Sequence, residues 1–243
     1  MTDEPAAGYA ARVAVEIDRL FVGAMAAGRE GGGRELVARH GPGAGGLLVE
    51  FRTALAWPGR GVRPEGFAAV LRYRELAQAR RGVAAQAAHG WLAVDADGTF
   101  SATERGHAFL RDLYALHAEV TGRLWPGVPG QLVARVGRVL AAAVDAGPGP
   151  ALHAMAPPYE PAGAPPGLLL LNRLGTLRYH RADAHATAWA AAGQTATGIQ
   201  AMAPGPARDA VEEETNARAA APYAALTAPE RRDLLDDLSA LGR

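Results

Sequence analysis

The feature that most constrains the fold of this chain is a hairpin signal near its middle. Two short strand-prone segments, Trp91–Val94 and Thr99–Ser101, flank the dipeptide Asp97-Gly98. That dipeptide favours a tight turn, because glycine adopts a positive φ without a steric penalty. The residues that follow fit a capping box, with Ser101 as N-cap and Glu104 reaching back to it. The sequence therefore predicts a strand, a turn, a second strand and then a long helix.

Two helices are predicted just before this hairpin. The first begins at Pro64, since proline is well tolerated in a first helical turn. The second spans Leu76–Ala88 and places Arg80, Arg81 and Gln86 on its polar side. Two helices, a two-stranded wing and a closing helix together make a winged helix-turn-helix.

The hairpin region resembles the wing and following helix of MarR-like regulators, whose usual phrase is G-L-(L/V)…D-G…L-T-x-x-G. The matching segments are Gly90-Trp91-Leu92, Asp97-Gly98 and Thr103-Glu104-Arg105-Gly106. The resemblance extends over about 60 residues when the winged-helix elements are aligned. It implies a regulator of transcription that binds double-stranded DNA.

Arginines are concentrated in the same region. Between positions 60 and 81 there are six arginines against Glu65 and Glu75, an excess of four positive charges. Such an excess is typical of a surface that meets DNA phosphates, although arginines also form i,i+4 pairs or solvate helix faces. The residues predicted to contact DNA are Arg72, Arg74, Arg80, Arg81 and Gln86.

The remainder of the chain has mainly helical periodicity. The predicted helices are 9–27, 34–40, 47–57, 131–144, 168–192, 209–220 and 229–241, with Pro/Gly-rich linkers at 147–167 and 198–206. We expect a mainly α fold in three regions: N-terminal helices (1–60), the winged helix-turn-helix with its two-stranded wing (61–125), and a C-terminal helical region (126–243). Its long helices are candidates for a ligand site and for a homodimer interface.

The densest polar cluster lies on the predicted helix 168–192. Cations and histidines here interrupt an apolar stripe, and burying them is costly unless something pairs with them. An anionic or polar small molecule is one such partner; Glu212, Glu213 and Glu214 are another. The predicted ligand-binding residues are Arg178, Tyr179, Arg181, His185 and Trp189, and the predicted acid–base pair is His180 with Asp183. A metal is not expected, because a 100° step per residue separates His180 from His185 by roughly 140°.

This cluster also resembles a phrase, L-R-x-H-R-x-D-x-H, in an actinobacterial helix-turn-helix family named after a salinosporamide-cluster member. The matching residues are Leu177, Arg178, His180, Arg181, Asp183 and His185. A second phrase of that family, E-x-x-T-(D/N)…A-A-x-P-(W/Y), is similar to Glu212, Thr215, Asn216, Ala219, Ala220, Pro222 and Tyr223. The family's winged helix lies between the two phrases, whereas here it lies upstream of both. The resemblance marks a site and implies no particular reaction.

Composition excludes several kinds of chemistry. The chain has no cysteine, and all 25 of its Lys+Arg positions are arginine, so thiolate nucleophiles, lysine Schiff bases and P-loops are excluded. The segment Gly41–Gly46 fits G-x-G-x-x-G, but no strand precedes it, so no cofactor is expected. The acidic start lacks a signal peptide, and the apolar run Gly167–Leu171 is too short for a membrane span. We therefore expect a cytoplasmic protein with no membrane partner.

Three functional hypotheses follow. The first is a ligand-responsive winged-helix transcription regulator. The second is a winged-helix scaffold that binds a small molecule, or acts as a cofactor-free enzyme of specialised metabolism, through the helix that carries Arg178 to His185. The third is a structural or partner-binding helical protein.

Overall fold

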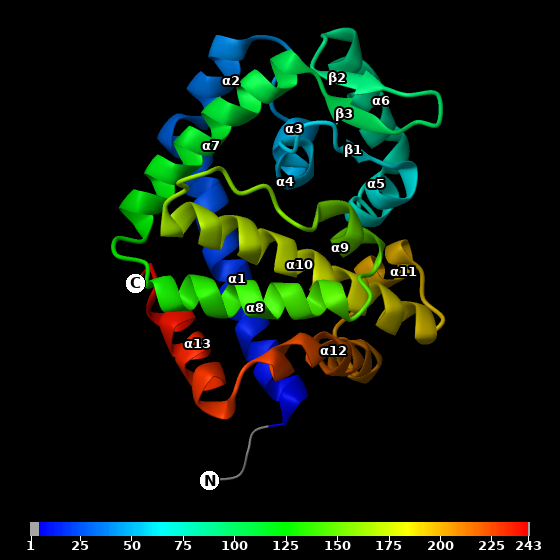
Figure 1. Cartoon of the computed structure of the whole chain (residues 1–243). Coiled ribbons are helices and arrows are strands. Elements are labelled where there is room, and N and C mark those ends of the chain that lie inside the picture. Colours follow the sequence, from blue (N-terminus) through cyan, green and yellow to red (C-terminus); the bar gives the residue numbers. More distant parts are fainter. Residues whose placement is uncertain (1–4, 243) are drawn as a thin grey trace.

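The computed structural model describes residues 5–242 and is mainly helical with one small sheet (Figure 1). In chain order the elements are α1 (Ala6–Gly28), a kink (Arg29–Gly33), α2 (Arg34–His40), α3 (Leu47–Glu50), α4 (Arg52–Leu55), β1 (Gly61–Val62), α5 (Pro64–Val70), α6 (Leu76–Ala88), β2 (Leu92–Val94), β3 (Phe100–Ala102), α7 (Glu104–Leu124), α8 (Gly130–Asp145), α9 (Pro150–Met155), α10 (Pro166–Ala191), α11 (Ala196–Ala201), α12 (Pro206–Ala219), a 3-10 turn (Ala221–Ala225) and α13 (Ala228–Ala240). The prediction of a mainly α chain is confirmed, and so is the β-hairpin predicted from Trp91, although its first strand begins one residue later, at Leu92.

The sheet has three strands, not the predicted two. β2 and β3 form the expected hairpin, with Leu92 opposite Ala102, and β1 pairs antiparallel with the other edge of β3. β1 was missed because it is only two residues long and lies in the Gly/Pro-rich connector at 58–64, where no alternation of side chains is visible. The strand order is β1-β3-β2.

The start of α7 also differs from the prediction. Ser101 lies within β3, opposite Ala93, and the N-cap of α7 is Thr103, whose hydroxyl accepts a hydrogen bond from the Gly106 amide at 3.1 Å. The same hydroxyl donates to the Gly90 carbonyl at 2.7 Å. Strand pairing therefore continues through Ala102, and the N-cap lies two residues after the position predicted from local cap chemistry.

Two helices lie in segments that were expected to be loops. α9 lies in the linker at 147–167, and α11 overlaps the start of the linker at 198–206. Both are six residues long, too short for a periodic pattern to reveal. Thr195 is the N-cap of α11, and its hydroxyl accepts a hydrogen bond from the Gly198 amide. The first turn of α9 is held by the carboxylate of Asp183 in α10.

The described residues form two large apolar cores with α10 between them. One joins α1 to α8, α10 and α13, and the other surrounds the sheet with α3 to α5 and α7. Tyr179 of α10 packs against both cores. The predicted N-terminal region (1–60) therefore contributes to both cores: α1 packs against the C-terminal helices, while residues 36–56 pack around the sheet. Figure 1 shows α8 and α10 side by side with α1 behind them.

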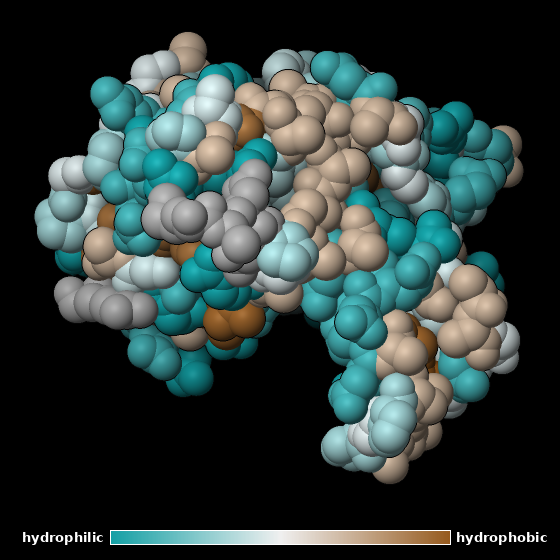
Figure 2. Space-filling model, turned by 90° about the horizontal axis from the view of Figure 1, so that it is seen from below, coloured by the Kyte–Doolittle hydropathy of each residue, from teal (hydrophilic) through white to brown (hydrophobic). Residues whose placement is uncertain are grey.

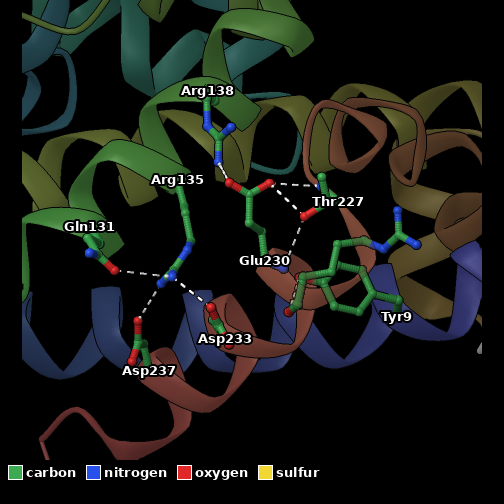
Figure 3. Close-up of polar contacts among 9 residues, drawn as sticks. Tyr9, Gln131, Arg135, Arg138, Thr227, Glu230, Asp233 and Asp237 are labelled. Atoms are coloured by element: carbon green, nitrogen blue, oxygen red, sulfur yellow. Dashed lines mark hydrogen bonds and ion pairs between the residues drawn. The ribbon is translucent and has the colours of Figure 1, made fainter.

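Polar contacts join the C-terminal helix α13 to α8 (Figure 3). Arg135 of α8 lies 2.8 Å from Asp233 and 2.9 Å from Asp237, and Arg138 pairs with Glu230. Glu230 forms a capping box with Thr227, and hydrogen bonds from Thr227 and Arg138 lower the pKa of Glu230 to about 2. The C-terminal helix is thus joined to α8 through the same carboxylate that caps it.

Within residues 5–242 no helix is both long enough and apolar enough to cross a membrane. Figure 2, a view from below, shows strongly hydrophobic side chains only as small separate patches among hydrophilic and intermediate ones. The predicted homodimer therefore has no broad apolar face on this side of the molecule.

The close approach of α7 to the hairpin gives a test of the fold. A Cβ at Gly106 would lie 2.5 Å from the Trp91 carbonyl oxygen, whereas one at Gly122 of the same helix would meet no atom within 4 Å. We expect Gly106→Ala to lower the free energy of unfolding by about 1–3 kcal/mol, and Gly122→Ala to raise it by up to about 1 kcal/mol. Urea unfolding measures both, and equal effects of the two variants would contradict this packing.

Candidate functional site

A cavity of about 640 Å³ opens between five parts of the fold that are far apart in the sequence. Its walls are α1, Glu50 at the end of α3, the segment from the end of α5 to Arg74, α10, and α12 with the 3-10 turn after it. Five of the predicted site residues line it: Arg178, Tyr179, His180, Arg181 and His185. Arg72 and Arg74, predicted to bind DNA, line it as well.

Arg178 pairs with an acid that sequence reasoning did not identify. Its Nε and Nη2 lie 3.0 and 2.7 Å from the same oxygen, Oδ1 of Asp18 in α1. The guanidinium carbon also lies 4.5 Å from the centre of the Phe21 ring, in a cation–π contact. Asp18 precedes Arg178 by 160 positions, so no local pattern could link them.

Arg181 forms the ion pair with α12 that the structural hypothesis proposed. Its Nη2 lies 3.2 Å from Oε2 of Glu212, and its Nη1 donates to the Asn216 side-chain oxygen at 2.7 Å. Arg181 thus has a carboxylate partner within the chain, as the hypothesis of a structural network predicted.

Asp183 is paired with Arg72 and not with His180. The Arg72 Nη2 donates to Asp183 Oδ1, and its Nη1 donates to the Ala182 carbonyl at 3.0 Å. Asp183 also accepts the backbone amides of Ala151 and Leu152 at 3.2 and 2.8 Å, at the first turn of α9. The predicted acid–base pair is therefore replaced by an ion pair that caps a helix, and Arg72 is turned inward, away from a DNA-facing surface.

Burial favours the uncharged form of both histidines that line the cavity. Burial is the main cause that lowers the pKa of His180, partly offset by its hydrogen bond with the Ala219 backbone and by the charge of Asp183. Burial likewise lowers the pKa of His185, against the opposing charge of Glu212. The Nε2 atoms of His180 and His185 are both buried and have no hydrogen-bond partner within residues 5–242.

A hydrogen-bonded chain connects the segment after α5 to α10. Trp189 Nε1 donates to the Tyr73 hydroxyl at 3.1 Å, and that hydroxyl lies 2.7 Å from His185 Nδ1. The indole N–H can only donate, so the Tyr73 oxygen accepts from Trp189, while the tautomer of His185 sets the direction of the second hydrogen bond. Burial raises the pKa of Tyr73, so it stays protonated. Tyr73 was missed, although its position between two predicted helices, flanked by Arg72 and Arg74, was a visible signal.

The other predicted DNA-binding residues are divided between internal and surface positions. Gln86 is buried and donates to the Gly43 and Gly45 carbonyls at 2.8 and 2.7 Å. Arg74 pairs with Glu50 at 3.0 Å, and Arg81 with Glu75 at 3.5 Å. Arg80 is exposed and has no ion pair within the described chain.

Two further arginines of the predicted basic region support α9 and the segment after it. Arg60 donates to the carbonyls of Ala154, Ala156 and Pro157 at 2.6–3.0 Å. Arg63 lies 3.2 Å from His153 Nε2. Five of the six arginines of the predicted basic region therefore make contacts within the protein.

Comparison of this chain with protein-family models, with curated proteins and with solved structures finds no significant match. Among residues 5–242, no group of three or more His, Asp or Glu side chains is arranged to hold a metal ion.

The Arg72–Asp183 pair gives a second test. Its side chains are only 11% and 9% exposed, and removing one member leaves a buried charge without its counter-ion. We expect Asp183→Ala to lower the free energy of unfolding by about 3–5 kcal/mol. Glu119→Ala, which removes the exposed partner of Arg123 at 3.9 Å, is the control and should cost less than about 1 kcal/mol. A loss below 1 kcal/mol for Asp183→Ala in urea unfolding would refute the structural role of this pair.

Proposed function

We propose that this protein binds a small polar molecule in the cavity between α1, α10 and α12. The observation that carries the proposal is the cavity itself, whose volume of about 640 Å³ lies within the usual range for small-molecule sites. Apolar groups of α1 face the charged and aromatic side chains of α10 across it. A combination of apolar wall and a few oriented polar groups is typical of a ligand site.

Binding is better supported than acid–base catalysis. A general base needs an accessible atom within hydrogen-bond reach of the substrate. The Nε2 atoms of both cavity histidines are buried, and Asp183 is held by Arg72 and α9. Arg74, Arg178 and Arg181 remain accessible and are held in ion pairs. They stay charged, so they bind and orient ligands but do not act as proton-transferring bases.

The binding proposal can be tested by filling the cavity. Ala14 of α1 lines it and is half-buried, so Ala14→Trp should occupy the space without removing a charge. We expect amino-acid-sized polar compounds, screened by saturation-transfer NMR, to bind the wild type and to lose at least about 10-fold in affinity in Ala14→Trp, since buried contacts of the ligand are replaced.

The control is Ala115→Trp, in a separate cavity next to α7. Compounds that bind the wild type and this control but not Ala14→Trp support the proposal. Compounds that bind the wild type and both variants equally well, or the absence of any binder, would count against it.

A ligand-responsive regulator is the second candidate. The order helix, strand, helix, helix, strand, strand from α4 to β3 supports a winged helix-turn-helix, in which α6 is the recognition helix. The segment Arg72–Arg74, which leads into α6, forms a wall of the cavity. A ligand that contacts this wall would favour particular positions of α6, and so couple binding in the cavity to binding of DNA.

The exposed side of α6 sets the expected strength of DNA binding. It consists of alanines with Gln78, Arg80 and Arg81, so phosphate contacts would outnumber contacts to bases. We expect a gel shift of the protein's own upstream DNA only at low salt, and a weaker shift for the double variant Arg80→Ala/Arg81→Ala. Arg123→Ala, on α7, is the control. No shift at low salt would remove this candidate, while two half-sites in the bound DNA would support the predicted homodimer.

A further inference from the structure

We infer that the cavity takes a zwitterion, a molecule with an ammonium and a carboxylate group close together, and that the Arg178–Asp18 pair is where its charges dock. This inference rests on the proposed binding function and narrows the chemical class of the ligand. The sequence alone favoured an anionic or polar ligand, because only the cations of α10 could be recognised as a cluster.

The charges around the cavity are balanced. Arg72, Arg74, Arg178 and Arg181 line it, and each has a carboxylate partner: Asp183, Glu50, Asp18 and Glu212 respectively. A ligand with only a negative charge would lose its hydration without meeting a net positive field. A ligand that carries both charges can satisfy an arginine and a carboxylate together, which makes electrostatic complementarity possible.

Two of these pairs contain a member whose polar side-chain atoms all have hydrogen-bond partners, Glu50 and Arg72. Both carboxylate oxygens of Glu50 are engaged, one by the Tyr179 hydroxyl at 3.3 Å and the other by Arg74. The Arg72 guanidinium donates from all three nitrogens, to Ala69, Ala182 and Asp183. Glu212 faces Arg181 with one oxygen, and its other oxygen lies 3.5 Å from His185 Nε2. Glu50 and Arg72 are therefore poor docking points, because each of their polar side-chain atoms already has a partner.

The Arg178–Asp18 pair combines an unused donor and an unused acceptor with the Phe21 ring beneath its arginine. Only Oδ1 of Asp18 meets Arg178, and Oδ2 accepts no hydrogen bond within residues 5–242. Nη1 of Arg178 makes no hydrogen bond in that range either. The side chains are 38% and 60% exposed, so a ligand can reach them. A ligand carboxylate would accept from Nη1 while a neighbouring ammonium donates to Oδ2.

Arg178 is held in position before a ligand arrives. Its guanidinium lies over the Phe21 ring, and Phe21 in turn packs where Gly175 has no side chain: a Cβ there would lie 2.7 Å from the ring. A donor whose orientation is already fixed loses less conformational entropy on binding. The pair is therefore better organised than an ordinary exposed ion pair.

The wall beside this pair indicates the rest of the ligand. Ala11, Ala14 and Val15 of α1 line the same cavity, and Val15 is 66% exposed. Covering exposed apolar surface of this kind is favourable. An α-amino acid with an apolar side chain combines the two neighbouring charges with such a group.

Four forms of one compound test the inference by titration calorimetry. They are L-phenylalanine, N-acetyl-L-phenylalanine with only the negative charge, L-phenylalaninamide with only the positive charge, and N-acetyl-L-phenylalaninamide with neither. We expect the zwitterion to bind at least about 10-fold more tightly than each of the others, the factor that one charge-assisted hydrogen bond supplies.

Variants assign the docking atoms. Asp18→Asn should weaken the zwitterion and the amide but not the N-acetyl form, and Arg178→Gln should weaken the zwitterion and the N-acetyl form but not the amide. Glu214→Gln is the matched control, because Glu214 forms a similarly exposed pair with Arg218 at 2.7 Å outside the cavity. It should leave all four affinities unchanged.

The outcomes separate this inference from the proposed function. If N-acetyl-L-phenylalanine binds as tightly as the zwitterion, or if Asp18→Asn leaves zwitterion binding unchanged, the inference is overturned while the binding function stands. If none of the four compounds binds, the inference is also overturned, and the binding function is then decided by the Ala14→Trp screen alone.

Discussion

The buried ion pair between Arg72 and Asp183 joins the two halves of this molecule. Arg72 belongs to the turn before α6, and Asp183 to the middle of α10, yet the same carboxylate also accepts the first amides of α9. A carboxylate buried this far needs several partners, and those of Asp183 come from two other parts of the chain, the turn before α6 and the first turn of α9. Gly149 must remain a glycine for the same reason, since a Cβ there would lie about 2.5 Å from Asp183. The position of the cavity follows from this connection, because it brings the turn beside α10.

Helix α10 acts as the shared wall of the structure. It lies between the two apolar cores, and its polar side chains extend to a different neighbour at each turn: Asp18 of α1, Glu212 of α12 and Tyr73 after α5. A helix in contact on most sides has no single apolar stripe. This explains why a cluster of arginines and histidines could occur within an otherwise leucine-rich segment without marking a solvent-exposed face.

Sequence reasoning located the polar cluster but not its geometry. The helix from 168 to 192, the capping box at Thr227 and the hairpin after Trp91 were predictable, because each depends on residues that are close in the chain. The pairing of His180 with Asp183 was inferred from their spacing on one helix face. Spacing cannot show that a carboxylate has a stronger partner elsewhere, and here Arg72, which is 111 positions away, replaces the histidine.

The sequence by itself determined the elements and the chemical groups available: a mainly helical chain, a hairpin at Asp97-Gly98, cations that are all arginine, and a dense polar stretch from Arg178 to His185. Only the tertiary structure decided what each charge does. It turned Arg72 and Gln86 inward, paired Arg178 with Asp18, and formed a cavity from five segments. The physical reason is that an ion pair or a cavity wall depends on distances in space, and chain order fixes those distances only within a single helix or hairpin.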